Sequence, residues 1–217
     1  DLLKSGDLDG ALAALQDAVR KDAANPALRI FLFQLLCVRG DWKRAIAQLK
    51  LSAELDPTAT SMAQTYREGI ICEVYREKVF SGEKDPLIFG KPAEWIPLMV
   101  DALKAEAAGN PEQAARTRAD AFDMAPSASG KIDGQPFDWI ADADMRLGPL
   151  LEVIVNGRYF WMPFTSIARA EFEKPVDLRD AVWTPASIRL TNGGDIVALI
   201  PTRYAGTVDR GSDAEKL

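Results

Sequence analysis

The sequence predicts an α+β protein, in which an irregular array of helical repeats precedes a small antiparallel β-domain. Two observations support this fold class. A segment near the start of the chain recurs at a fixed offset, and from about residue 137 apolar residues occur in short runs separated by turn residues. We place the helical-repeat domain at residues 1–130 and the mainly β domain, a bent sheet or a barrel, at residues 137–217.

The repeat unit is visible in two segments, 6–19 (GDLDGALAALQDAV) and 40–53 (GDWKRAIAQLKLSA), which align without a gap at an offset of 34 residues. A third copy, GNPEQAARTRADAFDMAP, occupies 109–126. In each copy a glycine with a left-handed backbone is expected to end one helix, and the Asp or Asn that follows is expected to cap the next. The pattern therefore predicts helix–turn–helix units, the second of which ends at Asp56-Pro57.

Residues 6–57 resemble the tetratricopeptide consensus, and the period of 34 residues agrees with that family. The resemblance is weaker over 92–126 and weakest over 58–91, where TSMAQTYREGIICEVYREKVFSG is typical of one long helix and SGEKDPLIFGKP of a loop. The array is therefore predicted to be irregular, with an unrelated helical bundle as the alternative. The resemblance implies a concave surface that accepts a peptide or a helix.

Short strands are predicted in the C-terminal third of the chain. The first two, LLEVIV and RYFWMPF, flank Asn156-Gly157, the strongest short signal for a type I′ hairpin turn. Trp139, Trp161 and Trp183 are expected to supply the aromatic residues that a small core needs. Three further apolar runs follow the hairpin: SIARAEFE, ASIRLT and DIVALIPTRY.

Two groups of residues are candidates for contact with a protein partner. Arg29, Phe33 and Gln34 lie on the first helix of the second repeat and are predicted to face its groove. Tyr159 and Trp161 form an alternative surface in the β-domain. The other interpretation of both groups is that these residues belong to the protein core.

The segment DADMRLGP begins with Asp142 and Asp144, a spacing found in many metal and acid–base sites. It does not fit a calcium-binding loop, which needs Gly at position six and Glu at position twelve. Arg146 is expected to lower a carboxyl pKa, whereas a general acid needs a raised one. We interpret the segment as a structural junction, in which the carboxylates accept hydrogen bonds from backbone N–H groups and Arg146, and Gly148-Pro149 turns the chain into the first strand.

Composition narrows the possible functions. The chain of 217 residues has a net charge of −6, which argues against nucleic acid or an anionic membrane as partner. It has no histidine, the commonest general base and metal ligand, and we predict no catalytic, cofactor-binding or metal-binding residue. Cys37 and Cys72 lie in apolar helical segments and are expected to be free thiols, with one disulfide as the alternative. The charged opening segment DLLKSGDLDG is not expected to be a signal peptide.

The C-terminal motifs are similar to the ImpE/SciE family, also called TagJ-like, of accessory proteins of bacterial type VI secretion systems. The similarity covers essentially the whole chain and is most specific over 139–164, with support from 178–190 and 201–206. It implies a cytoplasmic, non-enzymatic adaptor that binds a helix of the small subunit of the contractile sheath. The similarity also implies a link between this adaptor and the AAA+ ATPase that recycles contracted sheath. The motifs are DADMRLGPLLEVIVNGRYFWMPF, DLRDAVWTPASIRL and IPTRYAG.

Two alternatives to a secretion-system adaptor remain open. The first is an enzyme or a small-ligand-binding β-domain that carries a helical targeting arm, and the second is a tetratricopeptide scaffold from another system. An enzyme is expected to contain a deep pocket with convergent polar groups, whereas an adaptor is expected to have a shallow apolar groove.

Overall fold

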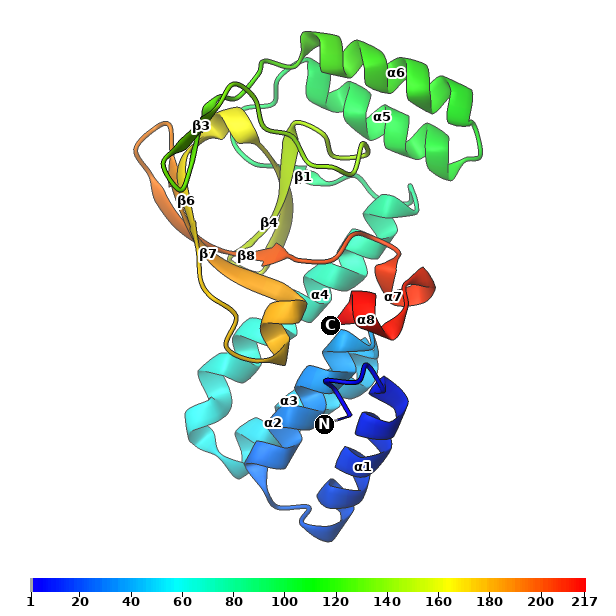
Figure 1. Ribbon diagram of the computed structural model, residues 1–217, viewed down its shortest axis with the longest axis vertical. Coiled ribbons are helices and arrows are strands. Elements are labelled where there is room, and N and C mark those ends of the chain that lie inside the picture. The colour runs from blue at the N-terminus through cyan, green and yellow to red at the C-terminus, as the bar shows by residue number, and fades with distance from the viewer. Residues whose placement is uncertain (1) are drawn as a thin grey trace. The chain divides into compact units, whose positions relative to one another are not determined.

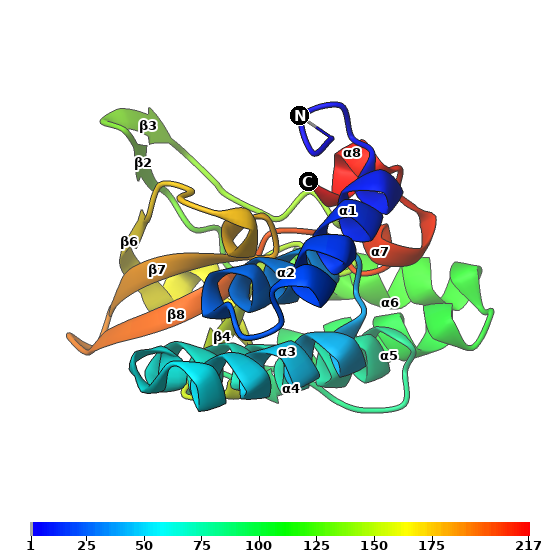
Figure 2. The same ribbon diagram turned by 90° about the horizontal axis from the view of Figure 1, so that it is seen from below.

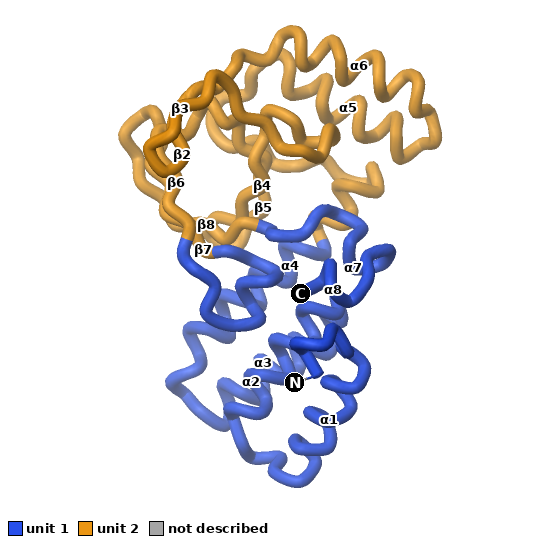
Figure 3. The backbone as a smooth tube through the Cα atoms, viewed as in Figure 1, with its two compact units in different colours: residues 1–74, 173–184, 201–217 blue, residues 75–172, 185–200 orange. Residues whose placement is uncertain are grey.

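The computed structural model describes residues 2–217, which form two compact units, each assembled from segments that are distant in the sequence (Figure 3). These units divide the chain at positions other than the predicted boundaries of domains 1–130 and 137–217, which remain a prediction. The first unit consists of Asp1–Val74, Glu173–Thr184 and Pro201–Leu217, and the second of Tyr75–Phe172 and Pro185–Ile200.

The first unit contains the predicted helical repeats. Its turns form as expected: Gly6 and Gly40 have φ angles of +73° and +70°, and Asp7 and Asp41 cap the helices that follow by accepting backbone N–H hydrogen bonds. The segment predicted to be one long helix forms a single helix over Thr60–Phe80. Cys37 is a buried free thiol, as expected. The main helices are α1 (Leu8–Lys21), α2 (Pro26–Val38), α3 (Trp42–Leu55) and α4 (Thr60–Phe80), whose last residues belong to the second unit, and α7 (Thr207–Arg210) and α8 (Asp213–Lys216) follow near the C-terminus (Figure 1).

The core of the first unit includes Trp183, which the sequence analysis had assigned to the β-domain. Its ring lies 5.7 Å from that of Tyr66 and 6.2 Å from that of Trp42, and its indole N–H donates a 3.0 Å hydrogen bond to Glu73. The assignment of Trp183 to the β-domain core is therefore wrong, because this residue, at the start of a strand, packs on the helices of the repeats. Tertiary contacts of this kind leave no signal in local periodicity.

The second unit is built on a six-stranded open sheet, the bent sheet rather than the barrel of the two predicted forms. The Asn156-Gly157 turn has positive φ at both residues, 49° and 68°, and joins β4 to β5 as predicted. Among the described strands β1 and β6 are the edges, in the order β1-β5-β4-β8-β7-β6. The strands are β1 (Leu87–Ile88), β4 (Leu150–Val155), β5 (Arg158–Pro163), β6 (Ile167–Phe172), β7 (Trp183–Leu190) and β8 (Asp195–Pro201).

The second unit also contains the third predicted repeat, α5 (Trp95–Ala107) packed on α6 (Pro111–Met124). Gly109 has a φ of +79° at the turn between them, as expected. Asn110 occupies the N-cap position of α6, but its side chain makes no capping hydrogen bond.

Two strand pairings were not predicted. Strand β1 lies in the segment predicted to be a loop and pairs in parallel with β5, so the predicted helical region 1–130 also contains a strand. A two-residue strand paired at this separation has no local signal. The ribbon of β2 (Gly130–Ile132) and β3 (Gln135–Phe137), seen apart from the six-stranded sheet in Figure 2, turns at Asp133-Gly134, where both φ angles are positive. Asp-Gly is itself a hairpin signal, which the sequence analysis overlooked.

A buried polar network joins the end of α4 to the sheet within the second unit. The Arg76 guanidinium donates two hydrogen bonds, of 2.6 and 2.7 Å, to the carboxylate of Glu152 on β4. The hydroxyl of Tyr159 donates to the same carboxylate and accepts a 2.7 Å hydrogen bond from the Trp161 indole N–H. All four side chains are buried, and burial together with the Glu152 charge raises the pKa of Tyr159 well above its usual value.

Replacing one member of this ion pair is expected to destabilise the protein more than replacing both. Glu152→Ala leaves the Arg76 charge buried without its carboxylate and is expected to lower the free energy of unfolding by about 3–5 kcal/mol. The double variant Arg76→Met, Glu152→Leu removes both charges, so its loss is expected to be smaller. Urea denaturation of the unmodified protein and of both variants measures their free energies of unfolding.

The exposed Lys50–Glu54 pair on α3 supplies the control for this comparison. Lys50→Ala is expected to change the free energy of unfolding by no more than about 1 kcal/mol. A loss for Glu152→Ala as small as that of Lys50→Ala would contradict the importance of the buried pair.

Candidate protein-interaction surface

The predicted groove residues of the repeats are engaged within the first unit. Phe33 is fully buried, and Gln34 is buried and hydrogen-bonded to the Asp177 carboxylate. Arg29 is half-buried and donates a 3.0 Å hydrogen bond to the side chain of Gln48. A partner would reach Phe33 and Gln34 only after a rearrangement of the core, and partner binding at these three positions remains a prediction.

The alternative pair, Tyr159 and Trp161, belongs to the buried network described above. Neither side chain is exposed to a partner in this structure, and partner binding at these two positions remains a prediction. Trp139 shows the opposite. Its predicted place is the core of the β-domain, but 69% of its surface is exposed. That assignment is wrong: Trp139 lies between β3 and β4, outside either strand, so the alternating pattern that turns side chains inward does not apply to it.

The junction loop before β4 is held by its own side chains. The Asp142 carboxylate accepts from the backbone N–H of Asp144 at 2.7 Å, and the Asp144 carboxylate accepts from both the backbone and the guanidinium of Arg146. Gly148 has a φ of +52° and lies so close to the Phe122 ring that a Cβ there would be 2.5 Å from a ring carbon. Arg146 therefore braces the loop, and Gly148 is the residue that this turn requires.

The carboxyl group of Asp144 remains ionised at neutral pH. Partial burial by itself raises its pKa, but the hydrogen bonds from Arg146 and the charges of Arg146 and Arg76 outweigh that effect and hold the pKa below its usual range. The same pairing raises the pKa of Arg146. A general acid needs the opposite shift, so the electrostatics of this loop suit a structural ion pair.

Beside this loop lies an apolar groove of 210 Å³, formed by the end of α6, the segment that follows it and the junction loop. Trp139 and Met145, with 69% and 59% of their surfaces exposed, are its most exposed large apolar residues. Asp142 is the only ionisable residue in its lining. The lining residues are Phe122, Ala125, Pro126, Ser127, Trp139, Ile140, Ala141, Asp142, Met145, Gly148 and Pro149.

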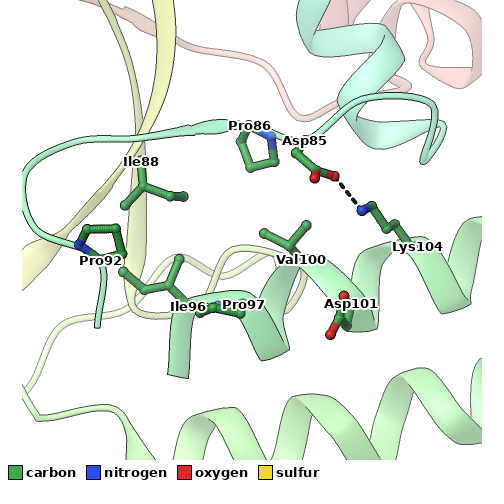
Figure 4. Close-up of a pocket in the computed structure, with 9 residues that line it drawn as sticks. All are labelled: Asp85, Pro86, Ile88, Pro92, Ile96, Pro97, Val100, Asp101 and Lys104. Carbon is green, nitrogen blue, oxygen red and sulfur yellow. Dashed lines mark ion pairs between the residues drawn. The ribbon is translucent and has the colours of Figure 1, made fainter. Parts of the chain in front are cut away.

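A second cavity, of 330 Å³, lies between the β1 segment and α5 (Figure 4). Its walls are prolines and aliphatic residues, and Asp85 and Lys104 form an ion pair of 2.5 Å at one end. No aromatic side chain lines it. Because aromatic residues supply much of the energy of protein–protein contacts, the groove at Trp139 is the stronger candidate for a docking surface.

The two linings differ in their ionisable residues: the groove at Trp139 contains Asp142, and the second cavity contains Asp85, Asp101 and Lys104. Within residues 2–217 there is no group of three or more Cys, Asp or Glu side chains arranged to hold a metal ion. No helix in that part of the chain combines the length and the apolar character needed to cross a membrane. Repeat helices and an apolar groove with an exposed Trp are features common in protein-interaction modules.

Comparison with known proteins gives the family. The profile of the tetratricopeptide repeat matches residues 2–65, and that of the ImpE protein matches residues 134–217. The type VI secretion system accessory component TagJ of Pseudomonas aeruginosa is 54% identical over all of this chain, which covers 77% of TagJ. The chain therefore belongs to the ImpE family and to the TagJ-like accessory components of type VI secretion systems, which confirms the resemblance found in the sequence.

A solved structure supports the fold. The crystal structure of protein VPA1032 from Vibrio parahaemolyticus matches 99% of this chain and 80% of its own, with a TM-score of 0.89 and 26% sequence identity. The fold of this chain therefore corresponds to that of an experimentally determined structure.

Removal of the Arg146 side chain is expected to destabilise the protein in a pH-dependent way. Arg146→Ala leaves the mostly buried Asp144 carboxylate without its guanidinium, and we expect a loss of about 1–3 kcal/mol in the free energy of unfolding at pH 7. Because the folded-state pKa of Asp144 is lowered, its contribution is present above the unfolded pKa of about 4 and is lost as pH falls through the folded value.

Urea denaturation of both proteins at about pH 7 and about pH 3 tests this expectation, because the difference between them should shrink at the lower pH. Arg146→Lys keeps the charge but not the two-pronged donor, and an intermediate loss is expected. A difference between Arg146→Ala and the unmodified protein that is equal at the two pH values would show that the ion pair is not its cause.

Proposed function

We propose that this protein is a non-enzymatic adaptor of a type VI secretion system, which acts in the cytoplasm by binding a helix of the small subunit of the contractile sheath. It would connect the sheath with the AAA+ ATPase that recycles it. The identity of 54% with a protein named as an accessory component of this system supports the proposal, as does the family resemblance from which both partners are taken.

The exposed groove at Trp139 is the observation on which the binding mode rests. An amphipathic helix that lies in a groove is anchored by apolar residues at positions i, i+3, i+4 and i+7. Large exposed aromatic residues at the centre of such a site usually contribute most of the binding energy, and methionine adapts its shape to different side chains. Trp139 and Met145 supply these two properties on one surface.

Charge favours a partner helix with basic residues beside its apolar stripe. The groove is lined by Asp142, the exposed Asp138 precedes Trp139, and the chain as a whole carries a net charge of −6. Opposite charges of this kind increase the association rate, and salt weakens the effect. A site for a small polar ligand would instead need several polar groups directed at one point, which the apolar lining of this groove does not provide.

Replacement of Trp139 is expected to weaken the binding of the helix. Calorimetric titration with a synthetic peptide from the N-terminal helix of the sheath small subunit measures the dissociation constant, which we expect to lie below about 100 μM. Trp139→Ala is expected to raise it by about 30-fold or more, the effect of losing a central aromatic anchor.

Phe31→Ala is the matched control. Phe31 is an exposed aromatic residue on α2, the helix that carries the predicted groove of the repeats. An effect of Phe31→Ala with none of Trp139→Ala would move the binding site to the repeats. Absence of binding below about 100 μM, with folded protein and soluble peptide, would remove the main support for the proposed function.

A further inference from the structure

Strand β6 ends the six-stranded sheet on the side opposite to β1. It pairs with β7 from Ile167↔Leu190 to Phe172↔Ala186, with a register shift between Ile167 and Arg169 and regular pairing from Arg169 to Phe172. No other strand of the part of the chain that the structure describes pairs with its outer side. Most of its residues are exposed, including Phe172, of whose surface 56% is accessible. An edge strand of this length offers backbone N–H and C=O groups to another strand.

The charges on β6 are arranged symmetrically about Ala170. Ala170 packs against the core of the sheet, so Arg169 and Glu171 project from the opposite face, where their side chains form an exposed ion pair of 2.6 Å. On the inner side Arg169 lies opposite Arg189 of β7, a pairing of like charges, and Glu171 lies opposite the uncharged Ser187. Arg169 therefore has no cross-strand carboxylate within its own sheet.

We propose that β6 is a self-association edge, at which two copies of this chain pair their β6 strands antiparallel about a twofold axis through Ala170. In this register Arg169 of each copy lies opposite Glu171 of the other, so the interface gains two cross-strand pairs of opposite charge. The inference does not depend on the partner suggested for the Trp139 groove.

The regular part of β6 available for this pairing is Arg169 to Phe172, because the register with β7 shifts between Ile167 and Arg169. The two charged residues lie inside this regular part. Charges on edge strands usually prevent association, because like charges meet when identical edges approach. The sequence Arg-Ala-Glu is an exception, since antiparallel pairing about its central residue brings opposite charges together.

A single pair of short strands buries less area than a stable dimer needs, so the association is expected to be weak and salt-sensitive. Sedimentation equilibrium of the 217-residue chain from about 5 to about 500 μM, at about 50 mM and about 500 mM salt, measures it. We expect a monomer–dimer equilibrium that salt shifts towards monomer. A protein that remains monomeric over the whole range at low salt overturns the proposal.

Charge reversal tests the register. Arg169→Glu and Glu171→Arg each place like charges opposite one another at both symmetric contacts, and each is expected to raise the dissociation constant by about tenfold or more. An equimolar mixture of the two variants restores opposite charges at both contacts, and the mixed dimer is expected to form about as tightly as the dimer of the unmodified protein. Fluorescence energy transfer between differently labelled variants detects the mixed species.

Two reversals on α6 serve as controls, because Arg116 and Glu112 are exposed there and give the same changes in net charge. Arg116→Glu and Glu112→Arg are expected to leave the dissociation constant unchanged. If they weaken the dimer as much as the β6 variants do, or if the mixture of β6 variants does not associate, the proposed register is wrong. A dimer insensitive to every reversal would place the interface elsewhere and overturn the proposal as well.

Discussion

The second unit depends on a single buried ion pair, that of Arg76 with Glu152. A charge that is taken out of water costs several kcal/mol, roughly, unless it is paired and fully hydrogen-bonded. Here the guanidinium binds both carboxylate oxygens, and the Tyr159 hydroxyl donates a further hydrogen bond to one of them. These requirements fix the end of α4 at one place along β4 and one orientation of the neighbouring β5. An apolar contact at this position would tolerate a sliding helix, whereas this pair does not.

The turns of the fold could be predicted from the sequence, because the residues at each turn determine its backbone conformation. A glycine before an aspartate makes the repeat turns, and Asn156-Gly157 makes the hairpin whatever surrounds it. The pairing of β1 with β5 and the position of Trp183 among the helices depend instead on residues distant in the sequence. A single sequence contains no signal for such contacts. The Asp133-Gly134 ribbon belongs to the first class, and its turn was recognisable in advance.

The candidate surface was harder to predict than the fold, because side chains of the same type are buried at one position of this chain and exposed at another. Tyr159 and Trp161 are predicted to form an alternative contact surface, but the polar group of each finds its hydrogen-bond partner inside the buried network. Trp139 has a large aromatic side chain of the kind usually found in a core, but it is exposed. Its neighbours Asp138 and Asp142 indicate an irregular, solvated segment, and that context, rather than the residue type, was the available signal.

The network and the groove are connected within the second unit. The Arg146 guanidinium, which braces the junction loop through Asp144, lies 4.7 Å from the centre of the Phe80 ring, and that ring in turn contacts Trp161 at 6.3 Å. A continuous series of packed and hydrogen-bonded groups thus leads from the buried ion pair to the loop that carries Met145 and forms one wall of the groove. A binding site supported in this way loses little conformational entropy when a partner docks, so more of the contact energy appears as affinity. In the proposed function, the Asp-x-Asp-x-Arg motif would serve binding by holding the groove in shape.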